Sequence, residues 1–359
     1  MFDDEAERPR VVHVFNTLNS GGLQRVVIAL ATWARQESQV ESVLVSAGGP
    51  LEKEVASSAL DWRRKHSRVG PLSEIVQLRR ILREFRPHVI HAHQRHDALI
   101  SHIASAGLGI SVVEHAHNTL PDTRLRFLSF RSKRIFAVSE DVKRMVVQTF
   151  RRDPERVTVV GGVPFNSSDT PVIERVAPAL DEPRLILGIG RLEEQKDPER
   201  FVRAIAEASK LANVAGRWLG AGSLDETCKK LASDLGSPVE FVGESRDVVG
   251  ELDRAHGLLI TSRWEGLGLV ILEAFARRRP VVGIALGGMG ELLGGGRGTI
   301  VDATATDREL ASALLSGTEF DLSTEKKTSL ALDYVEKRAS PEAVYGPIVR
   351  EYFDAVRKL

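Results

Sequence analysis

Cysteine is nearly missing from this sequence of 359 residues, which contains only Cys228 and therefore cannot form an internal disulfide bond. A long hydrophobic run is missing as well, because no apolar segment approaches the roughly 20 residues that a membrane-spanning helix needs. The opening residues, MFDDEAERPR, are acidic and polar, whereas a secretory signal is basic and then apolar. With 42% hydrophobic and 27% charged residues, these features predict a globular, cytoplasmic protein, and its length favours two domains.

An excess of charge of one sign is also lacking, since 49 basic residues balance 49 acidic ones. Residues 1–170 contain 24 Lys and Arg against 19 Asp and Glu, and residues 171–359 contain 25 against 30. This mild asymmetry is unlike the strongly basic face of a nucleic-acid-binding protein. We therefore expect no nucleic acid among its partners.

One stretch, RLRFLSFRSKR (124–134), is locally basic and carries Phe127, Leu128 and Phe130 between its five cations. We expect it to lie on the surface of the N-terminal domain and to make a peripheral contact with an anionic membrane, at its inner face, or with a lipid-linked molecule. Each cation near such a surface contributes about 1 kcal/mol. The alternative is a solvated helix face whose apolar side is buried.

Short β-branched runs alternate with helical patterns along the chain, which is typical of βαβ units and parallel sheets. A first series is VVHVF, ESVLVS, PHVIHAH, ISVVEHA, RIFAVS and RVTVV, and a second is RLILGIG, GRWLGAG, VEFVG, HGLLITS, RPVVGIA and GTIVD. Between them, residues 161–183 are rich in Gly, Pro, Ser and Asp without a sustained period, and we interpret them as a linker.

The sequence therefore predicts an α/β protein with two Rossmann-like, doubly wound domains. The N-terminal domain covers residues 1–165, the C-terminal domain covers residues 180–340, and a helix at 341–359 is expected to cross back onto the first domain. Sheets of this kind bind ligands beyond the carboxyl ends of their strands. We expect the site in a cleft between the two domains, built from the loops that follow strands.

The dinucleotide-binding fingerprint GxGxxG is absent after the first strand, which counts against a nicotinamide enzyme. In its place, the loop NTLNSGG leads into a helix that is expected to begin near Leu23. Gly21 and Gly22 then lie where a phosphate can approach a helix N-terminus. A glycine turn that only the backbone requires is an equally good interpretation of these two residues.

A second loop follows the strand RLILGIG and contains Arg191 and Lys196 ahead of the next helix. An arginine can grip phosphate oxygens as a fork, and a lysine can bind them as a point charge. The alternative is a pair of solvated surface cations, which is the usual state of Lys and Arg.

A third loop follows HGLLITS and opens the stretch WEGLGLVILEA, in which Glu265 and Glu273 flank an apolar run. We expect a helix to begin near Gly268, so that Glu265 projects from the loop and Glu273 lies in the second turn. The free amide groups of that helix start can hold an anion. Carboxylates repel phosphate, so their partners would be sugar hydroxyls. A surface acid in a loop and an ordinary early-turn acid are the alternatives.

Several histidines raise the question of a zinc site, because an H-x-H pair on a strand places both rings on one face. They are His91, His93, His96, His115 and His117. Their spacing is not a closed set of metal ligands, and no carboxylate-rich pair accompanies them. We therefore predict no metal site, and we expect His115 to be a structural histidine with satisfied hydrogen bonds.

Together these stretches resemble the retaining glycosyltransferases of family 4, which have the GT-B fold and transfer sugar from a nucleotide-sugar donor. The resemblance covers nearly the whole chain and is carried by SGGLQRVVIALA, HAH, EHAHNT, IFAVSEDVKRM, GIGRLEEQKDPERFVRAI and the segment from EFVGESRD to GGMGELL. The paired acids are similar to the E-x7-E motif of that family, which is specific when Gly-Arg-Leu and a lysine precede it. The resemblance implies two Rossmann-like domains that face a central cleft.

The resemblance also implies roles in binding the donor. Arg191 and Lys196 would neutralise the donor diphosphate, helped by backbone amides at Gly22 and Leu269. Glu273 would bind the ribose hydroxyls. No cofactor is expected, because the nucleotide-diphosphate sugar is itself the donor substrate and the family needs no metal.

Other positions would surround the base and the sugar. The base would lie near Val242, while Glu265 and the amides of Leu267 and Gly268 would hold the transferred sugar. His117 matches the family histidine near the reaction centre. Glu265, His117 and the two cations would thus carry catalysis, with retention by front-face attack and no side-chain nucleophile.

The sequence departs from the family pattern at three places: Gly161-Gly162, Arg279 and Gln24. The first two are expected to concern packing, and Gln24 is expected to concern the acceptor. That acceptor would be a glycan, a lipid-linked molecule or a small molecule. Two alternatives stay open, a nucleotide-sugar epimerase of the same architecture and a non-catalytic nucleotide-sugar binding protein.

Overall fold

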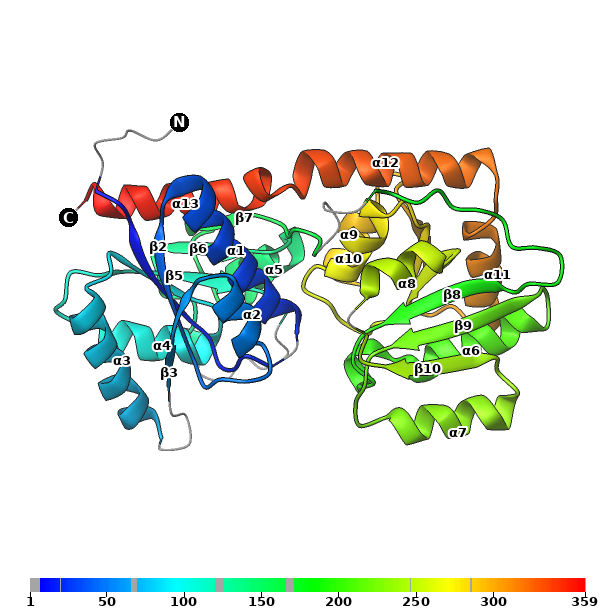
Figure 1. The fold of residues 1–359 in the computed structure, drawn as a ribbon, viewed down its shortest axis with the longest axis horizontal. Helices are drawn as coiled ribbons and strands as arrows, with labels where there is room; N and C mark the ends of the chain where they lie inside the picture. The colour runs from blue at the N-terminus through cyan, green and yellow to red at the C-terminus, as the bar shows by residue number, and fades with distance from the viewer. Residues whose placement is uncertain are drawn as a thin grey trace. The chain divides into compact units, whose positions relative to one another are not determined.

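The computed structural model describes residues 7–19, 21–65, 70–119, 126–165, 171–245, 247–284 and 286–358. The chain divides into two compact units (Figure 1). The first unit contains Met1–Gly162 together with Ser340–Leu359, and the second contains Val163–Ala339. Each unit is an α/β fold around a parallel sheet of its own.

The first unit is built on a seven-stranded sheet in the order β3-β2-β1-β4-β5-β6-β7. Its strands are β1 Arg10–Val14, β2 Glu41–Ser46, β3 Asp61–Arg64, β4 Val89–Ala92, β5 Ser111–Ala116, β6 Arg134–Ala137 and β7 Val157–Val159. The sequence predicts all of them except β3, whose residues DWRR show no apolar alternation. An edge strand tolerates such polar residues because one side of it stays unpaired.

Helices cover both faces of this sheet. They are α1 Gly22–Ser38, α2 Glu52–Ser57, α3 Pro71–Phe85, α4 Arg95–Ala104, α5 Glu140–Arg144 and α13 Pro341–Val356, with short helical turns η2 Arg126–Leu128, η3 Met145–Thr149 and η4 Pro154–Arg156. Figure 1 shows α13, in red, beside α1, in blue, although they come from opposite ends of the chain. The rings of Trp33 and Tyr345 meet at 5.7 Å between these two helices.

Alternation along the strands assigns residues to the two faces. Val12 and Val14 of β1 pack with Ile90 of β4 against α3 and α4. The residues between them, including His13 and His91, therefore belong to the opposite face. There His91 meets Tyr352 of α13.

The second unit is built on a six-stranded sheet in the order β10-β9-β8-β11-β12-β13. Its strands are β8 Arg184–Ile189, β9 Val214–Leu219, β10 Val239–Gly243, β11 Gly257–Ile260, β12 Val281–Ile284 and β13 Thr299–Val301. Its helices are α6 Pro198–Ser209, α7 Asp225–Leu235, α8 Val248–Arg254, α9 Leu269–Ala276, α10 Gly288–Leu293, α11 Asp307–Gly317 and α12 Leu322–Arg338, with the turn η5 Glu194–Lys196. The sequence predicts all six strands.

A compact core holds α6, α7 and α11 against this sheet, and Phe201 of α6 meets Trp218 of β9 edge to face at 5.2 Å. In the predicted linker, residues 171–179 contain no helix or strand, and residues 166–170 lie outside the described part of the chain. Among the described helices, none is both long and apolar enough to cross a bilayer.

Two fully buried arginines tie the described linker segment to the second unit. Arg277 makes a bidentate contact with Asp253, at 2.8 Å and 2.6 Å, and also donates to the carbonyl of Pro171. Arg279 donates to the carbonyls of Leu252, Asp253 and Ile173. The departure from the family pattern at Arg279 therefore concerns packing, as expected, because its guanidinium joins α8 to the linker.

We predict that Asp253→Ala lowers the free energy of unfolding of the second unit by about 3–5 kcal/mol, because it leaves a buried guanidinium without its carboxylate. The measurement is the midpoint of urea unfolding. Asp234→Ala is the control, since the Lys230–Asp234 pair is exposed and is worth less than about 1 kcal/mol. Equal losses for the two variants would contradict the prediction.

Candidate functional site

Two loops of the second unit meet at the point where its strand order reverses. β8 and β11 are neighbours in the sheet although they are not consecutive along the chain. Ligands of doubly wound folds bind outside the carboxyl ends of strands at such a point. The loop after β8 carries Arg191 and Lys196, and the loop after β11 carries Glu265. The fold thus brings two of the predicted loops together.

A buried contact between Lys196 and Glu265 joins these loops. The Lys196 ammonium donates to Oε1 of Glu265, and the side chains are only 17% and 11% exposed. Ser262 Oγ donates to the same carboxylate oxygen at 3.0 Å. The sequence predicted that Glu265 projects from its loop, but in the structure its carboxylate is held by Lys196 and Ser262. It turns inward because a cation and a hydroxyl are available there.

Further bonds hold the backbone on both sides of this contact. Thr261 Oγ1 donates to the carbonyls of Lys196 and Asp197, at 2.9 Å and 3.0 Å. The Asp197 carboxylate caps α6 and accepts from Arg263 Nε at 3.1 Å. Thr261, Asp197 and Arg263 were not predicted from the sequence. The pattern Asp-Pro-Glu ahead of a helix is an N-cap signal that would have indicated Asp197.

Glycines allow the two close approaches in this region. A Cβ at Gly190, whose φ is 152°, would lie 2.9 Å from Cγ of Lys196. A Cβ at Gly288 would lie 2.3 Å from the carbonyl oxygen of Gly266. The start of α10 therefore packs on the backbone beside Glu265. Gly288 was missed, and the run GGMG after a predicted strand is the signal that points to it.

The predicted apolar helix is shorter than the apolar run. α9 begins at Leu269, after Gly268 in a left-handed conformation with φ 89°, so residues 264–268 form a loop. Leu267 is buried in this loop. Glu273 lies half-buried in the second turn of α9, as expected. The first amides of α9 receive no side-chain cap among the described residues.

Two other predicted residues lie apart from the buried contact. Arg191 is exposed, and its guanidinium donates to Gln195 at 3.2 Å. Val242 is 38% exposed and lies in β10, at the edge of the sheet. Gly21 and Gly22 belong to the first unit, where Gly21 precedes α1. Their contacts with a donor stay predictions from the resemblance.

In the first unit, imidazoles gather at the corresponding reversal of strand order, between β1 and β4. His13 Nδ1 lies 3.1 Å from His93 Nε2, and His93 Nδ1 lies 3.0 Å from His117 Nε2. His91 Nδ1 lies 2.6 Å from the hydroxyl of Tyr352. The alternation of β1, β4 and β5 places these rings on one face of the sheet. His13 was missed because it has no H-x-H partner in the sequence.

The expectation for His115 is wrong. Its ring is buried, and neither ring nitrogen has a hydrogen-bond partner among the described residues. The ring instead stacks on His117, with centroids 4.0 Å apart, and on His91, at 5.4 Å. Stacking between neighbouring strands aligns the ring faces and turns its nitrogens away from donors and acceptors.

Burial keeps these imidazoles neutral. It lowers the pKa of His13 and of His117 from 6.5 to about 3. Burial, followed by the nearby histidines, also lowers the pKa of His91, His93 and His115. Because the unfolded chain binds these protons more strongly, the cluster costs stability as pH falls below about 6.5.

A metal ion is the obvious ligand to test against this cluster. His13, His91 and His93 each bring one nitrogen within 4.8 Å of the others, and so do His93, His115 and His117. The two shortest nitrogen pairs, however, meet the geometry of hydrogen bonds. Each of these pairs shares a proton, whereas metal ligands direct their lone pairs at a common ion.

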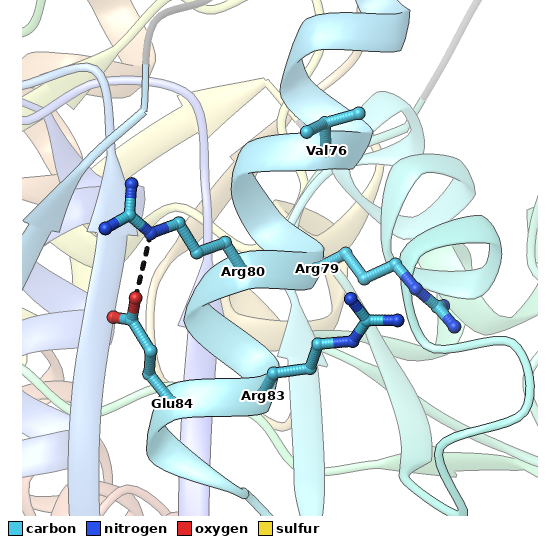
Figure 2. A pocket seen from close by; sticks show the side chains of 5 residues that line it. All are labelled: Val76, Arg79, Arg80, Arg83 and Glu84. Carbon is cyan, nitrogen blue, oxygen red and sulfur yellow. Dashed lines mark hydrogen bonds and ion pairs between the residues drawn. The ribbon is translucent and has the colours of Figure 1, made fainter.

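A hollow of about 510 Å³ lies on α3, away from the predicted site residues. Figure 2 shows Arg79, Arg80 and Arg83 along the helix, with Arg80 paired to Glu84 at 2.8 Å. Arg79 donates to the carbonyls at the end of α4. Arg79 therefore serves helix packing, and Arg80 serves a local ion pair.

Comparisons with known proteins match both units. Residues 20–162 match the family model "Glycosyltransferase Family 4", and residues 183–317 match "Glycosyl transferases group 1". The chain is 25% identical over 277 residues, 74% of this chain and 76% of the relative, to a Campylobacter jejuni protein. That relative is named GalNAc-alpha-(1->4)-GalNAc-alpha-(1->3)-diNAcBac-PP-undecaprenol alpha-1,4-N-acetyl-D-galactosaminyltransferase.

Two solved structures share the fold. A glycosyltransferase from Rickettsia africae has a TM-score of 0.83 at 18% identity, over 98% of this chain and 100% of the other. An Anabaena protein in complex with UDP-glucose has a TM-score of 0.81 at 19% identity, over 98% and 100%. The chain thus belongs to the family 4 type of glycosyltransferases with the GT-B fold.

Proposed function

We propose that this glycosyltransferase is retaining and metal-independent, and that it moves a hexose-type sugar from a nucleotide-diphosphate sugar to an acceptor hydroxyl. The buried contact between Lys196 and Glu265 carries the proposal. A donor of this class joins a diphosphate directly to a sugar. A cation suits the phosphate oxygens and a carboxylate suits the sugar hydroxyls, so adjacent groups of both kinds match that junction.

When the donor binds, Lys196 and Glu265 separate and each takes a group of the donor as its new partner. The Lys196 ammonium turns to the diphosphate, and the carboxylate of Glu265 becomes free to accept from a hydroxyl of the sugar. The uncapped amides at Leu269 and the fork of Arg191 add positive potential for the phosphate oxygens. The cations and helix amides replace a metal ion at the diphosphate.

The remaining predicted residues complete the donor site. Glu273 accepts hydrogen bonds from the ribose hydroxyls, and the base lies along β10 near Val242. The amides of Leu267 and Gly268 support the sugar beside Glu265. The role of His117 near the reaction centre stays a prediction from the resemblance. These roles rest on the resemblance, and the neighbouring positions of β8 and β11 in the sheet support them.

Transfer with retention needs no side-chain nucleophile. The acceptor oxygen attacks the anomeric carbon on the face from which the phosphate leaves. The bond from that carbon to the phosphate oxygen breaks, the bond to the acceptor oxygen forms, and the acceptor proton moves to the departing phosphate oxygen. The protein contributes by positioning both partners and by stabilising the leaving diphosphate through Lys196 and Arg191.

The acceptor is proposed to be a glycan or a lipid-linked molecule. Support comes from the Campylobacter jejuni relative, whose name describes a saccharide linked to undecaprenol through a diphosphate. A small-molecule acceptor remains the alternative, because sequence identity of 25% does not carry a specificity over.

We also propose a peripheral contact with an anionic membrane through Arg126, Phe127, Arg131 and Lys133. Phe127 is 65% exposed, and the three cations around it are exposed as well. The sequence predicted that Phe130 belongs to this surface. Phe130 is instead buried against Phe150, with ring centroids 4.9 Å apart. Residues 124–125 of the predicted stretch lie outside the described residues.

We predict different losses for the two acids. Glu273→Ala removes a charge-assisted bond to ribose, about 1.5–3 kcal/mol, and so weakens free nucleotide and nucleotide sugar alike by roughly tenfold to a hundredfold. Glu265→Ala spares the free nucleotide and lowers turnover, because its partner is the reacting sugar.

Calorimetry with free nucleotide tests both variants. Glu207→Ala is the control, since Glu207 lies near the C-terminal end of α6 and pairs with Lys210. Glu273→Gln is expected to be milder than Ala, because the amide still accepts a hydrogen bond and does not repel the diphosphate. If the Glu273→Ala variant binds free nucleotide as tightly as the unmodified protein does, Glu273 does not bind the ribose.

We predict full transfer in excess EDTA with a panel of nucleotide sugars. Product should form only when an acceptor is present, and NMR should show that it keeps the anomeric configuration of the donor. A rate that EDTA abolishes and Mg²⁺ or Mn²⁺ restores would contradict metal independence. Conversion of the donor without an acceptor would favour the epimerase, and binding of a donor without any conversion would favour the non-catalytic binding protein.

We predict that the protein sediments with anionic vesicles at low salt and that Arg131→Glu combined with Lys133→Glu abolishes this. Each cation contributes about 1 kcal/mol at such a surface, and salt screens the attraction. Lys229→Glu combined with Lys230→Glu is the matched control, because it reverses two exposed cations on α7. No sedimentation of the unmodified protein would leave a solvated surface as the only interpretation.

A further inference from the structure

The histidine cluster of the first unit contains an uninterrupted chain of three imidazoles. His93 is the middle member, because its Nε2 meets Nδ1 of His13 at 3.1 Å and its Nδ1 meets Nε2 of His117 at 3.0 Å. Two ring nitrogens at these distances need one proton between them, since two lone pairs would repel and two protons would clash. Each contact therefore contains one proton.

Counting protons leaves only two arrangements. Three neutral imidazoles carry three ring protons, and two of them occupy the contacts. The third lies at one end of the chain, either on Nε2 of His13 or on Nδ1 of His117. The choice also sets the direction of both hydrogen bonds, because each ring has one donor nitrogen and one acceptor nitrogen.

Burial decides between the two ends. Nε2 of His13 is buried and has no partner among the described residues. An N–H group there would be an unsatisfied buried donor, which is rare and costly, whereas an unsatisfied acceptor is tolerated more often. His117 is less deeply buried than His13, and its Nδ1 is not among the fully buried ring nitrogens that lack a partner, so its open end can reach water or a ligand. The third proton therefore lies on Nδ1 of His117.

We propose that His13 and His93 are positioning residues that hold His117 as the Nδ1–H tautomer. His13 donates to His93, His93 donates to His117, and the open nitrogen of His117 is then a neutral donor. Such a group binds an oxygen lone pair of the substrate sugar and cannot accept the proton of the acceptor hydroxyl. Its place in catalysis rests on the proposed function, whereas the tautomer itself does not.

The other buried groups of the cluster do not compete for this chain. The ring of His91 stacks on that of His93, with centroids 4.2 Å apart, but its Nδ1 forms a hydrogen bond with the hydroxyl of Tyr352. His115 stacks on His117 and makes no hydrogen bond within the described residues. The lowered pKa values of His13, His93 and His117 agree with three neutral rings. Tyr352→Phe thus removes a polar contact from the same cluster and leaves the chain of three intact.

NMR of the full chain with ¹⁵N-labelled histidine reads the tautomer directly, and His117→Gln assigns the His117 signals. We expect a protonated Nδ1 and an unprotonated Nε2 on His117, unchanged between pH 8 and pH 5. A proton on Nε2, or titration within this range, would overturn the proposal. Addition of Zn²⁺ is the second arm, and loss of the hydrogen-bonded ring protons at stoichiometric Zn²⁺ would identify a metal site in its place.

Variants connect the tautomer to turnover. His93→Leu should allow His117 to move its proton to Nε2 and should lower turnover by roughly tenfold, the loss of about one hydrogen bond. Tyr352→Phe should keep both the tautomer and the turnover of the unmodified protein. A His117 tautomer that stays the same in His93→Leu, or changes in Tyr352→Phe, would overturn the proposal. If no transfer activity is found, the tautomer of the unmodified protein still decides it.

Discussion

The contact between Lys196 and Glu265 is the interaction on which the donor region depends. It joins the loops after two neighbouring strands, and both side chains are largely shielded from water. Lys196 and Glu265 therefore satisfy each other's charge in the absence of a ligand. Ser262 and Thr261 hold the carboxylate and the lysine backbone in place. A ligand that replaces this contact must therefore offer both an anion and a hydroxyl.

Both units place polar side chains at the reversal of strand order, but these side chains are charged in the second unit and neutral in the first. In the second unit, the opposite charges of Lys196 and Glu265 meet in the loops after β8 and β11. In the first unit, imidazoles have other imidazoles and Tyr352 as hydrogen-bond partners. Without charged partners, burial keeps them neutral. A chain of neutral rings can orient a hydrogen bond to sugar without attracting phosphate.

Buried arginine illustrates how a departure from the family pattern is accommodated. The resemblance predicted a departure at Arg279, and a buried guanidinium at that place needs several acceptors. The carbonyls at the end of α8 and in the linker supply them. Asp253 supplies the negative charge through Arg277. Arg279 thus ties the linker to α8 of the second unit.

Periodicity in the sequence by itself determined the parallel α/β architecture, because buried strands of this kind need continuous apolar runs, and those runs are visible without coordinates. It missed β3, since an edge strand needs no such run. The motifs after the strands also predicted that Lys196 and Glu265 lie in loops and that Glu273 lies in the second turn of a helix. Only the tertiary structure decided that Glu265 is buried against Lys196, that Phe130 points inward, and that His13 joins His93. These contacts link residues far apart in the chain, and local patterns carry no information on which side chains meet across a sheet.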